Sequence, residues 1–287
     1  MDILNVTYAL NGLLMIAMPV GLAIFLTRRW KLGWRIWWIG AATFVLSQVG
    51  HIPFNVLISK VLNNTSMVYW PPLAQTIFNA VFLGLSAGLF EEGARYLVLR
   101  FWAKDARSWR RGVLFGAGHG GAEAIIFGAL ALYGYFQLVY LRNMDLTKLI
   151  PAGQLDLARQ QVAAYWSAPW YATLLGALER FFTIPIQIAM ASLVMRAFTR
   201  KNIGWLFAAI GYHAVVDASA VLLVNHVGTY WLEAIVGGFS ILSVIVIFLL
   251  RQPEPPADPE PATPSSAPFI PKSVEETTEN LDKTRFQ

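Results

Sequence analysis

Two pairs of residues in the middle of the chain have the types and the spacing that metal chemistry requires. His119 and Glu123 stand at positions i and i+4 in the segment GHGGAEAIIFG, and His213 and Asp217 repeat this spacing in GYHAVVDASA. Residues four apart lie on the same face of a helix. Neutral imidazole and carboxylate suit Zn²⁺, which in catalytic sites binds about three protein ligands and keeps one position open. The two histidines with either Glu123 or Asp217 would meet that count.

A second group of charged residues could supply the base that hydrolysis needs. Glu91 and Glu92 are adjacent in SAGLFEEGARYLVLR, and Arg95 follows one helical turn later. A carboxylate near a bound metal can take a proton from water, whose pKa the metal lowers. Two adjacent residues on a helix point about 100° apart, so only one glutamate can face the site fully. We expect the other glutamate to pair with Arg95.

The elements that must position these side chains are membrane-spanning helices. Hydrophobic residues make up 56% of the 287 residues and charged residues only 14%, whereas a soluble domain has roughly 25% charged residues. About 20 apolar residues are enough for one helix across a ~30 Å hydrocarbon core. The sequence therefore predicts an all-α integral membrane protein whose transmembrane domain, 1-251, has seven spans near residues 6-27, 34-59, 73-101, 112-140, 170-198, 203-225 and 229-250.

The charged residues inside these spans are expected to share one layer. Each costs roughly 2.5 to 3.5 kcal/mol on insertion scales, which makes it a functional candidate. With a rise of about 1.5 Å per residue, the charged or histidine side chains of this layer lie roughly 10 to 16 Å from the predicted cytoplasmic ends of their spans: Glu91, Glu92, His119, Glu123 and His213. Asp217 lies roughly 21 Å from that end. Glu179, at roughly 28 Å, and its neighbour Arg180 could support the site or form a local packing pair.

Glycines are expected to bring the third and fourth spans close together, because small residues let membrane helices approach. Gly84, Gly88 and Gly93 surround the glutamate pair in the third span. The fourth span has glycines around His119 at Gly116, Gly118, Gly120 and Gly121. Close approach of these two spans would bring the acidic pair to the histidine.

The distribution of basic residues predicts the orientation. Eleven Lys and Arg residues fall in connections on one side and four on the other, and cytoplasmic loops carry the excess. We therefore expect the N-terminus outside and the C-terminus inside a cell membrane, the cytoplasmic membrane of a prokaryote. The formal net charge of +5 reflects this topology and gives no reason to expect nucleic acid as a partner.

Two segments lie outside the spans. Residues 141-169 are long enough for a short amphipathic helix on the membrane surface, but we favour a plain loop there. Residues 252-287 are rich in Pro, Glu, Ser and Thr, a composition that cannot bury enough surface to fold, so they predict a disordered cytoplasmic tail. The chain has no cysteine, which excludes disulfides and thiolate ligands.

The residues together resemble a known family. FEEGARY, GHGGAEAI and GYHAVVDA are similar to the YhfC-like branch of the CAAX-protease and bacteriocin-immunity clan of intramembrane metalloproteases, over about residues 85-220. The resemblance implies hydrolysis of a peptide bond in a membrane-embedded protein or peptide. It also implies that Glu91 or Glu92 activates water and that His119 and His213 bind a metal, most simply zinc. Glu123 and Asp217 would be further ligands or would support the ligands.

The chain departs from this family at one position, and two other functions are consistent with the sequence. The YhfC-like branch carries a histidine eight residues after Glu179, where this chain has Gln187, so a site with a third histidine is not expected. Buried carboxylates and histidines also serve transporters and proton-coupled channels. A non-catalytic immunity or scaffold protein on the same fold is the other alternative.

Overall fold

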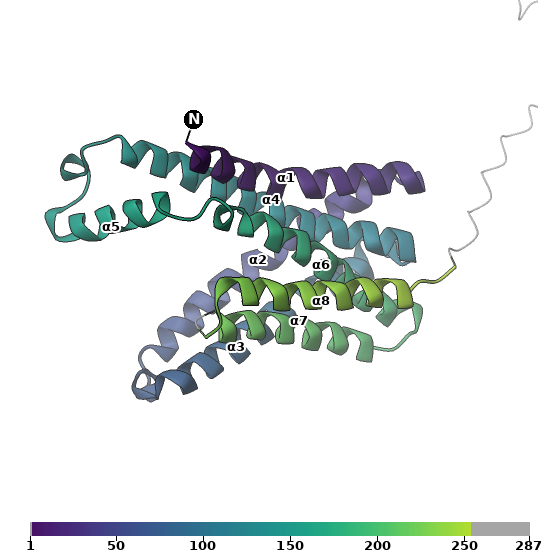
Figure 1. Cartoon of the computed structure of the whole chain (residues 1–287). Helices are drawn as coiled ribbons and strands as arrows, with labels where there is room; N and C mark the ends of the chain where they lie inside the picture. The colour runs from purple at the N-terminus through teal and green to yellow at the C-terminus, as the bar shows by residue number, and fades with distance from the viewer. Residues whose placement is uncertain (1, 225, 254–287) are drawn as a thin grey trace, which may run out of the picture. The chain divides into compact units, whose positions relative to one another are not determined.

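The described part of the protein is entirely helical. The computed structural model describes residues 2–224 and 226–253, and these ranges contain no strand (Figure 1). The predicted disordered tail lies outside the described residues from 254 onward. The eight α-helices are α1 Ile3–Trp30, α2 Arg35–Leu62, α3 Pro72–Phe101, α4 Trp109–Arg142, α5 Leu155–Trp166, α6 Leu175–Thr199, α7 Gly204–Leu223 and α8 Thr229–Leu249.

Seven of these helices are long and apolar enough to cross a membrane; among the described residues, only α5 is too short. Each of the seven overlaps one of the spans expected from the sequence, so the predicted fold class is confirmed. The helices run back and forth between two faces of the bundle (Figure 1). Local signals fix both ends of α1: Asp2 caps its N-terminus through the side chain, and Lys31 ends the helix in the left-handed conformation with φ 53°.

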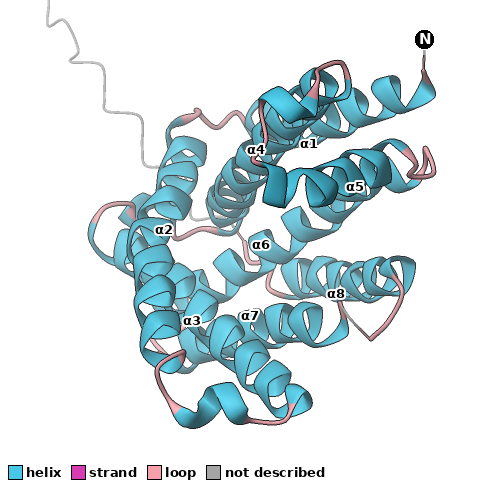
Figure 2. Cartoon of the chain, turned by 90° about the vertical axis from the view of Figure 1, so that its left-hand side faces the viewer, coloured by secondary structure: helices cyan, strands magenta, loops and turns pink. Residues whose placement is uncertain are grey.

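The helix α6 lies in the middle of the bundle (Figure 2), together with the N-terminal half of α4, in which residues 112–122 are buried. The helix α4 packs against α1, α2 and α6, and α6 also contacts α7 and α8. The helix α3 packs mainly against α7 and α2. In its most apolar stretch α6 has 72% of its residues buried, against 33% or less for each of the other six long helices. Side chains on α6 are therefore well placed to connect different parts of the bundle.

The glycines bring together different helices from those expected. A Cβ atom added at Gly84 or Gly88 of α3 would lie 2.5 or 2.7 Å from a backbone oxygen of α7, and one added at Gly118 of α4 would lie 2.0 Å from the Trp37 oxygen of α2. Gly116 and Gly120 of α4 lie against α6. The prediction that these glycines press the third span against the fourth was wrong. They let α3 approach α7, and let α4 approach α2 and α6.

The prediction of a plain loop at 141-169 was also wrong, because residues 155–166 form the amphipathic helix α5. Its C-terminal end is held by aromatic contacts. The rings of Tyr8 and Tyr165 stack with centroids 3.8 Å apart, and the Tyr8 hydroxyl donates a 2.7 Å hydrogen bond to the Tyr165 carbonyl. Arg142 lies 4.4 Å from the centre of the Trp166 ring. Burial at this junction raises the pKa of the Tyr165 hydroxyl, which therefore stays neutral.

The absence of cysteine allows a direct test of the proposed orientation. Thr147, between α4 and α5, and Lys104, between α3 and α4, are both exposed and lie at opposite faces. We expect a membrane-impermeant maleimide to label Thr147→Cys in intact cells, and Lys104→Cys only after permeabilisation. The reverse pattern of labelling would show that the N-terminus faces the cytoplasm.

The close contact between α2 and α4 predicts a large effect of one methyl group. Gly118→Ala places a Cβ atom 2.0 Å from the Trp37 backbone oxygen, so the helices must separate. We expect the free energy of unfolding to fall by about 1 to 3 kcal/mol, measured by thermal unfolding in detergent. Gly134→Ala on the same helix meets nothing within 4 Å and should leave stability unchanged or raise it by up to about 1 kcal/mol. Equal midpoints for the two variants would contradict this packing.

Candidate active site

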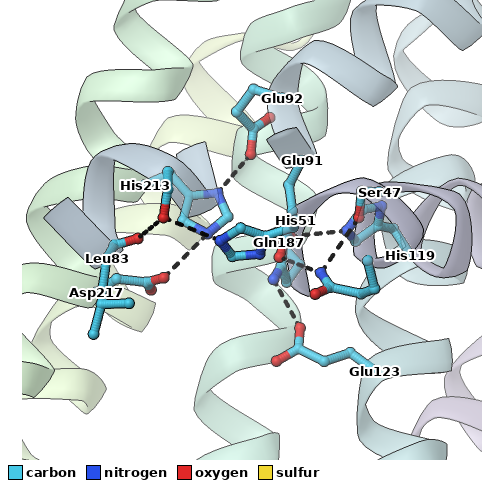
Figure 3. Close-up of polar contacts among 12 residues, drawn as sticks. Ser47, His51, Leu83, Glu91, Glu92, His119, Glu123, Gln187, His213 and Asp217 are labelled. Carbon is cyan, nitrogen blue, oxygen red and sulfur yellow. Dashed lines mark hydrogen bonds and ion pairs between the residues drawn. The ribbon is translucent and has the colours of Figure 1, made fainter. Parts of the chain in front are cut away.

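The structure brings both predicted histidines and the acidic pair into one buried layer (Figure 3). The glutamates come from α3, His119 from α4 and His213 from α7. Glu92 and His119 have no exposed surface, and Glu91 and His213 are 6% and 2% exposed. The depth estimate from the sequence thus correctly predicted that these residues would meet.

The first contact in this layer joins α3 to α4. His119 Nε2 lies 3.1 Å from Glu91 Oε2, and Arg95 Nε donates a 3.3 Å hydrogen bond to His119 Nδ1. Because arginine can only donate, this bond leaves the imidazole proton on Nε2, where it points to Glu91. The other oxygen, Glu91 Oε1, accepts a 3.0 Å bond from Gln48 Nε2 of α2. Glu91 is therefore held between α2 and α4.

The second contact joins α3 to α7. Glu92 Oε1 accepts hydrogen bonds from Arg95 Nη1 and, at 2.8 Å, from His213 Nδ1. Glu92 Oε2 is buried and has no hydrogen-bond partner among the described residues. His213 Nε2 lies 3.5 Å from Asp217 Oδ2. A carboxylate on Nδ1 is the usual arrangement behind a metal-binding histidine, because it fixes the ring with Nε2 available.

Arg95 lies at the centre of the layer, and its guanidinium offsets only part of the negative charge of the layer. Its guanidinium has no exposed surface, contacts Glu92, His119 and Gln187, and has one nitrogen 3.6 Å from Glu91. Two carboxylates and one guanidinium leave one negative charge if both imidazoles are neutral. Excess charge is costly in a dry interior. A cation or a proton bound in this layer would reduce that cost.

Glu123 takes a different place from the one expected for a metal ligand. Its Oε1 accepts a 2.6 Å hydrogen bond from Arg180 Nη1, and its Oε2 a 2.7 Å bond from Gln187 Nε2. Arg180 also contacts Glu179. Gln187 Oε1 in turn accepts a hydrogen bond from Arg95. Both oxygens of Glu123 are thus occupied, and Gln187 connects the ion pair of Arg180 to the central layer.

The helix α2 adds polar groups that the sequence analysis did not single out. His51 Nε2 lies 3.1 Å from Ser86 Oγ and 2.9 Å from Asn55 Nδ2, and the ring lies beside the central layer (Figure 3). Gln48, His51 and Asn55 recur at helical spacing and form a polar stripe on an apolar span. Such a stripe is the signal that could have identified them, because polar groups in spans rarely face lipid.

The donor chemistry of the layer fits a divalent cation, although the side chains are arranged in pairs. Within residues 2–224 and 226–253, no three His, Cys, Asp or Glu side chains are grouped closely enough to hold a metal ion. His213 is already oriented as a ligand, with Nε2 towards Asp217. His119 could coordinate through Nε2 only if the Arg95 contact to Nδ1 were given up. The excess negative charge and the unsatisfied Glu92 oxygen favour a cation here.

Fold and site define a multi-pass membrane protein with a buried layer of glutamate, histidine and arginine. The chain belongs to the YhfC intramembrane metalloprotease family, whose profile it matches over residues 14–240. It is 31% identical over 243 residues to the uncharacterized membrane protein YhfC of Bacillus subtilis (strain 168), with 82% of this chain and 92% of that protein covered. No solved structure matches.

Removing the guanidinium of Arg95 is expected to lower the stability of the protein strongly. Arg95→Met would leave Glu92 and Glu91 buried without their cation. Breaking a buried ion pair by removing one partner costs about 3 to 5 kcal/mol, which we expect in the free energy of unfolding measured in detergent. Arg35→Met is the matched control: its pair with Asp105 is 59% and 43% exposed, so the loss should stay below about 1 kcal/mol. Similar losses in both variants would contradict the central role of Arg95.

Proposed function

We propose that the chain is an intramembrane metal-dependent endopeptidase of the cytoplasmic membrane of a prokaryote. Its substrate would be a membrane-embedded protein or peptide. The observation that carries the proposal is the convergence of the Glu91–His119 and Glu92–His213 pairs from three helices in one buried layer. Membership of the family supports the metal and the peptidase reaction.

His119, His213 and Asp217 would hold the metal, with zinc the commonest choice for such ligands. Glu123 drops out of the ligand set because Arg180 and Gln187 occupy both of its oxygens. The bound cation would act as a Lewis acid on the carbonyl of the scissile peptide bond. His213 needs little rearrangement for this role, since Glu92 already orients its ring.

We assign the general base to Glu91, a choice that the sequence left open between Glu91 and Glu92. Glu92 is fully buried and shares one oxygen between Arg95 and His213, so it is suited to holding these two side chains. The Glu91 side chain is 8% exposed, and Oε2 lies at the histidine. Oε2 would take a proton from the attacking water and return it to the leaving amide nitrogen, so that one water is consumed and an acid and an amine are formed.

Arg95 would position the site. Its hydrogen bond to Glu92 holds the carboxylate that orients His213, and its contact with His119 Nδ1 would be released when His119 binds the metal through Nε2. The apolar helices around the layer keep bulk water out, which strengthens the interactions inside.

Metal content and cleavage, measured on the same variants, test the proposal. We expect wild-type protein purified without chelators to contain nearly one transition metal per chain, and His213→Ala to lose it because a ligand is removed. Glu91→Gln should retain the metal and lose cleavage by about 100-fold or more. Cleavage is measured by mass spectrometry on a library of apolar peptides in detergent micelles.

The control is His226→Ala, because the ring of His226 is exposed and, among the described residues, its one hydrogen-bond contact is with the backbone oxygen of Leu222. This variant should keep both metal and activity. Wild-type protein without a transition metal, or full cleavage by Glu91→Gln, would refute the mechanism.

A further inference from the structure

A second cluster of ionisable side chains lies where α6 and α8 begin. These two helices start at the same face of the bundle (Figure 1). Glu179 is the fifth residue of α6 and Glu233 the fifth residue of α8, so both lie about 6 Å from the start of their helix. Glu233 is only 7% exposed. The sequence analysis did not single it out.

One carboxylate oxygen of Glu233, Oε2, is buried without a donor in the described part of the chain. The charged neighbours of Glu233 are Glu179 and Arg180. The terminal nitrogens of Arg180 already donate to Glu123 and Glu179, so the guanidinium satisfies two other carboxylates first.

The cluster therefore carries more negative than positive charge. Arg180 pairs with Glu123 and Glu179 and is the one cation that acts on Glu233 among the described residues. With all three carboxylates ionised, two negative charges are left uncompensated. A buried carboxylate without a partner is unfavourable in a membrane. A positively charged group with N–H donors would supply both the charge and the missing hydrogen bonds.

The position of the cluster indicates where that group comes from. Lys and Arg side chains near the ends of membrane-spanning segments extend towards the membrane surface. In a substrate helix they would lie near the end of the span, as Glu179 and Glu233 do in α6 and α8. The Glu179 side chain is 43% exposed and leaves the cluster open from outside the bundle. Within the described ranges no three carboxylates are grouped for a metal ion, whereas an ammonium or guanidinium needs only separate acceptors.

We propose that Glu233 and Glu179 form a subsite for a basic side chain, Lys or Arg, near one end of the membrane-spanning segment of the substrate. This inference rests on the proposed function, in which the substrate is a membrane polypeptide. The hydrogen bonds Arg180–Glu123, Glu123–Gln187 and Gln187–Arg95 connect the subsite to the layer where cleavage would occur.

The subsite is tested by binding, on the non-cleaving Glu91→Gln protein in lipid nanodiscs. The probes are two fluorescent apolar peptides of transmembrane length that differ at one terminal position, Lys in one and norleucine in the other. We expect the Lys peptide to bind about tenfold tighter, as charge pairs at interfaces do. Adding Glu233→Gln should remove most of this preference, while the charge-conserving Glu233→Asp should retain part of it.

Asp156→Asn on α5, whose side chain is 99% exposed, is the matched control and should leave the preference unchanged. Equal affinity of the two peptides for the Glu91→Gln protein would overturn the subsite; it is also the result expected if Glu233 simply holds a proton. A preference that survives Glu233→Gln in folded protein would overturn the assignment of Glu233. Because no cleavage is measured, either result is distinguishable from failure of the proposed peptidase activity.

Discussion

The arrangement of the bundle depends on how one buried guanidinium is satisfied. Arg95 has no exposed surface, and it contacts side chains from its own helix, from α4 and from α6. Removing a charge from water costs far more than a single hydrogen bond returns, so these partners have to be in place together. Any shift of α4 or α6 relative to α3 would leave part of the charge unsatisfied. The glycines at the close helix contacts are the means by which the backbones come near enough.

Adjacent glutamates are useful here because they point in different directions. Residues next to each other on a helix are about 100° apart, so Glu91 reaches His119 of α4 while Glu92 reaches His213 of α7. Arg95, one turn later, contacts both sides. The helix α3 thus separates two histidine–carboxylate pairs and also connects them. In the proposed reaction, a substrate carbonyl entering between the pairs would meet Glu91 as the base and the metal held by His119, His213 and Asp217.

Hydropathy and helical rise were enough to predict the seven long helices and the meeting of Glu91, Glu92, His119 and His213. The neighbours of each helix were not predictable in the same way. Glycine in a span indicates that something approaches closely, but it does not say which helix does, and Gly84 and Gly118 in fact face α7 and α2. The partners of Glu123 depend on how α4 and α6 are rotated about their axes. The spacing of residues along one helix does not reveal this rotation. Glu233 was missed for a related reason: a single carboxylate near a span end resembles an interfacial residue until its burial is known.

Gln187 shows how the two charged clusters can be joined without adding charge. Its amide accepts a hydrogen bond from Arg95 through Oε1 and donates one to Glu123 through Nε2. A carboxylate at this position would repel Glu123, and a lysine would repel Arg95, whereas an amide offers an acceptor and a donor side by side. The result is a continuous series of hydrogen bonds from His213 through Arg95 to Arg180 and Glu179. Gln187 does not change its charge, so it can hold the two clusters in fixed positions but does not carry a proton between them. The proton transfers of the proposed reaction therefore stay within the layer of Glu91 and His119.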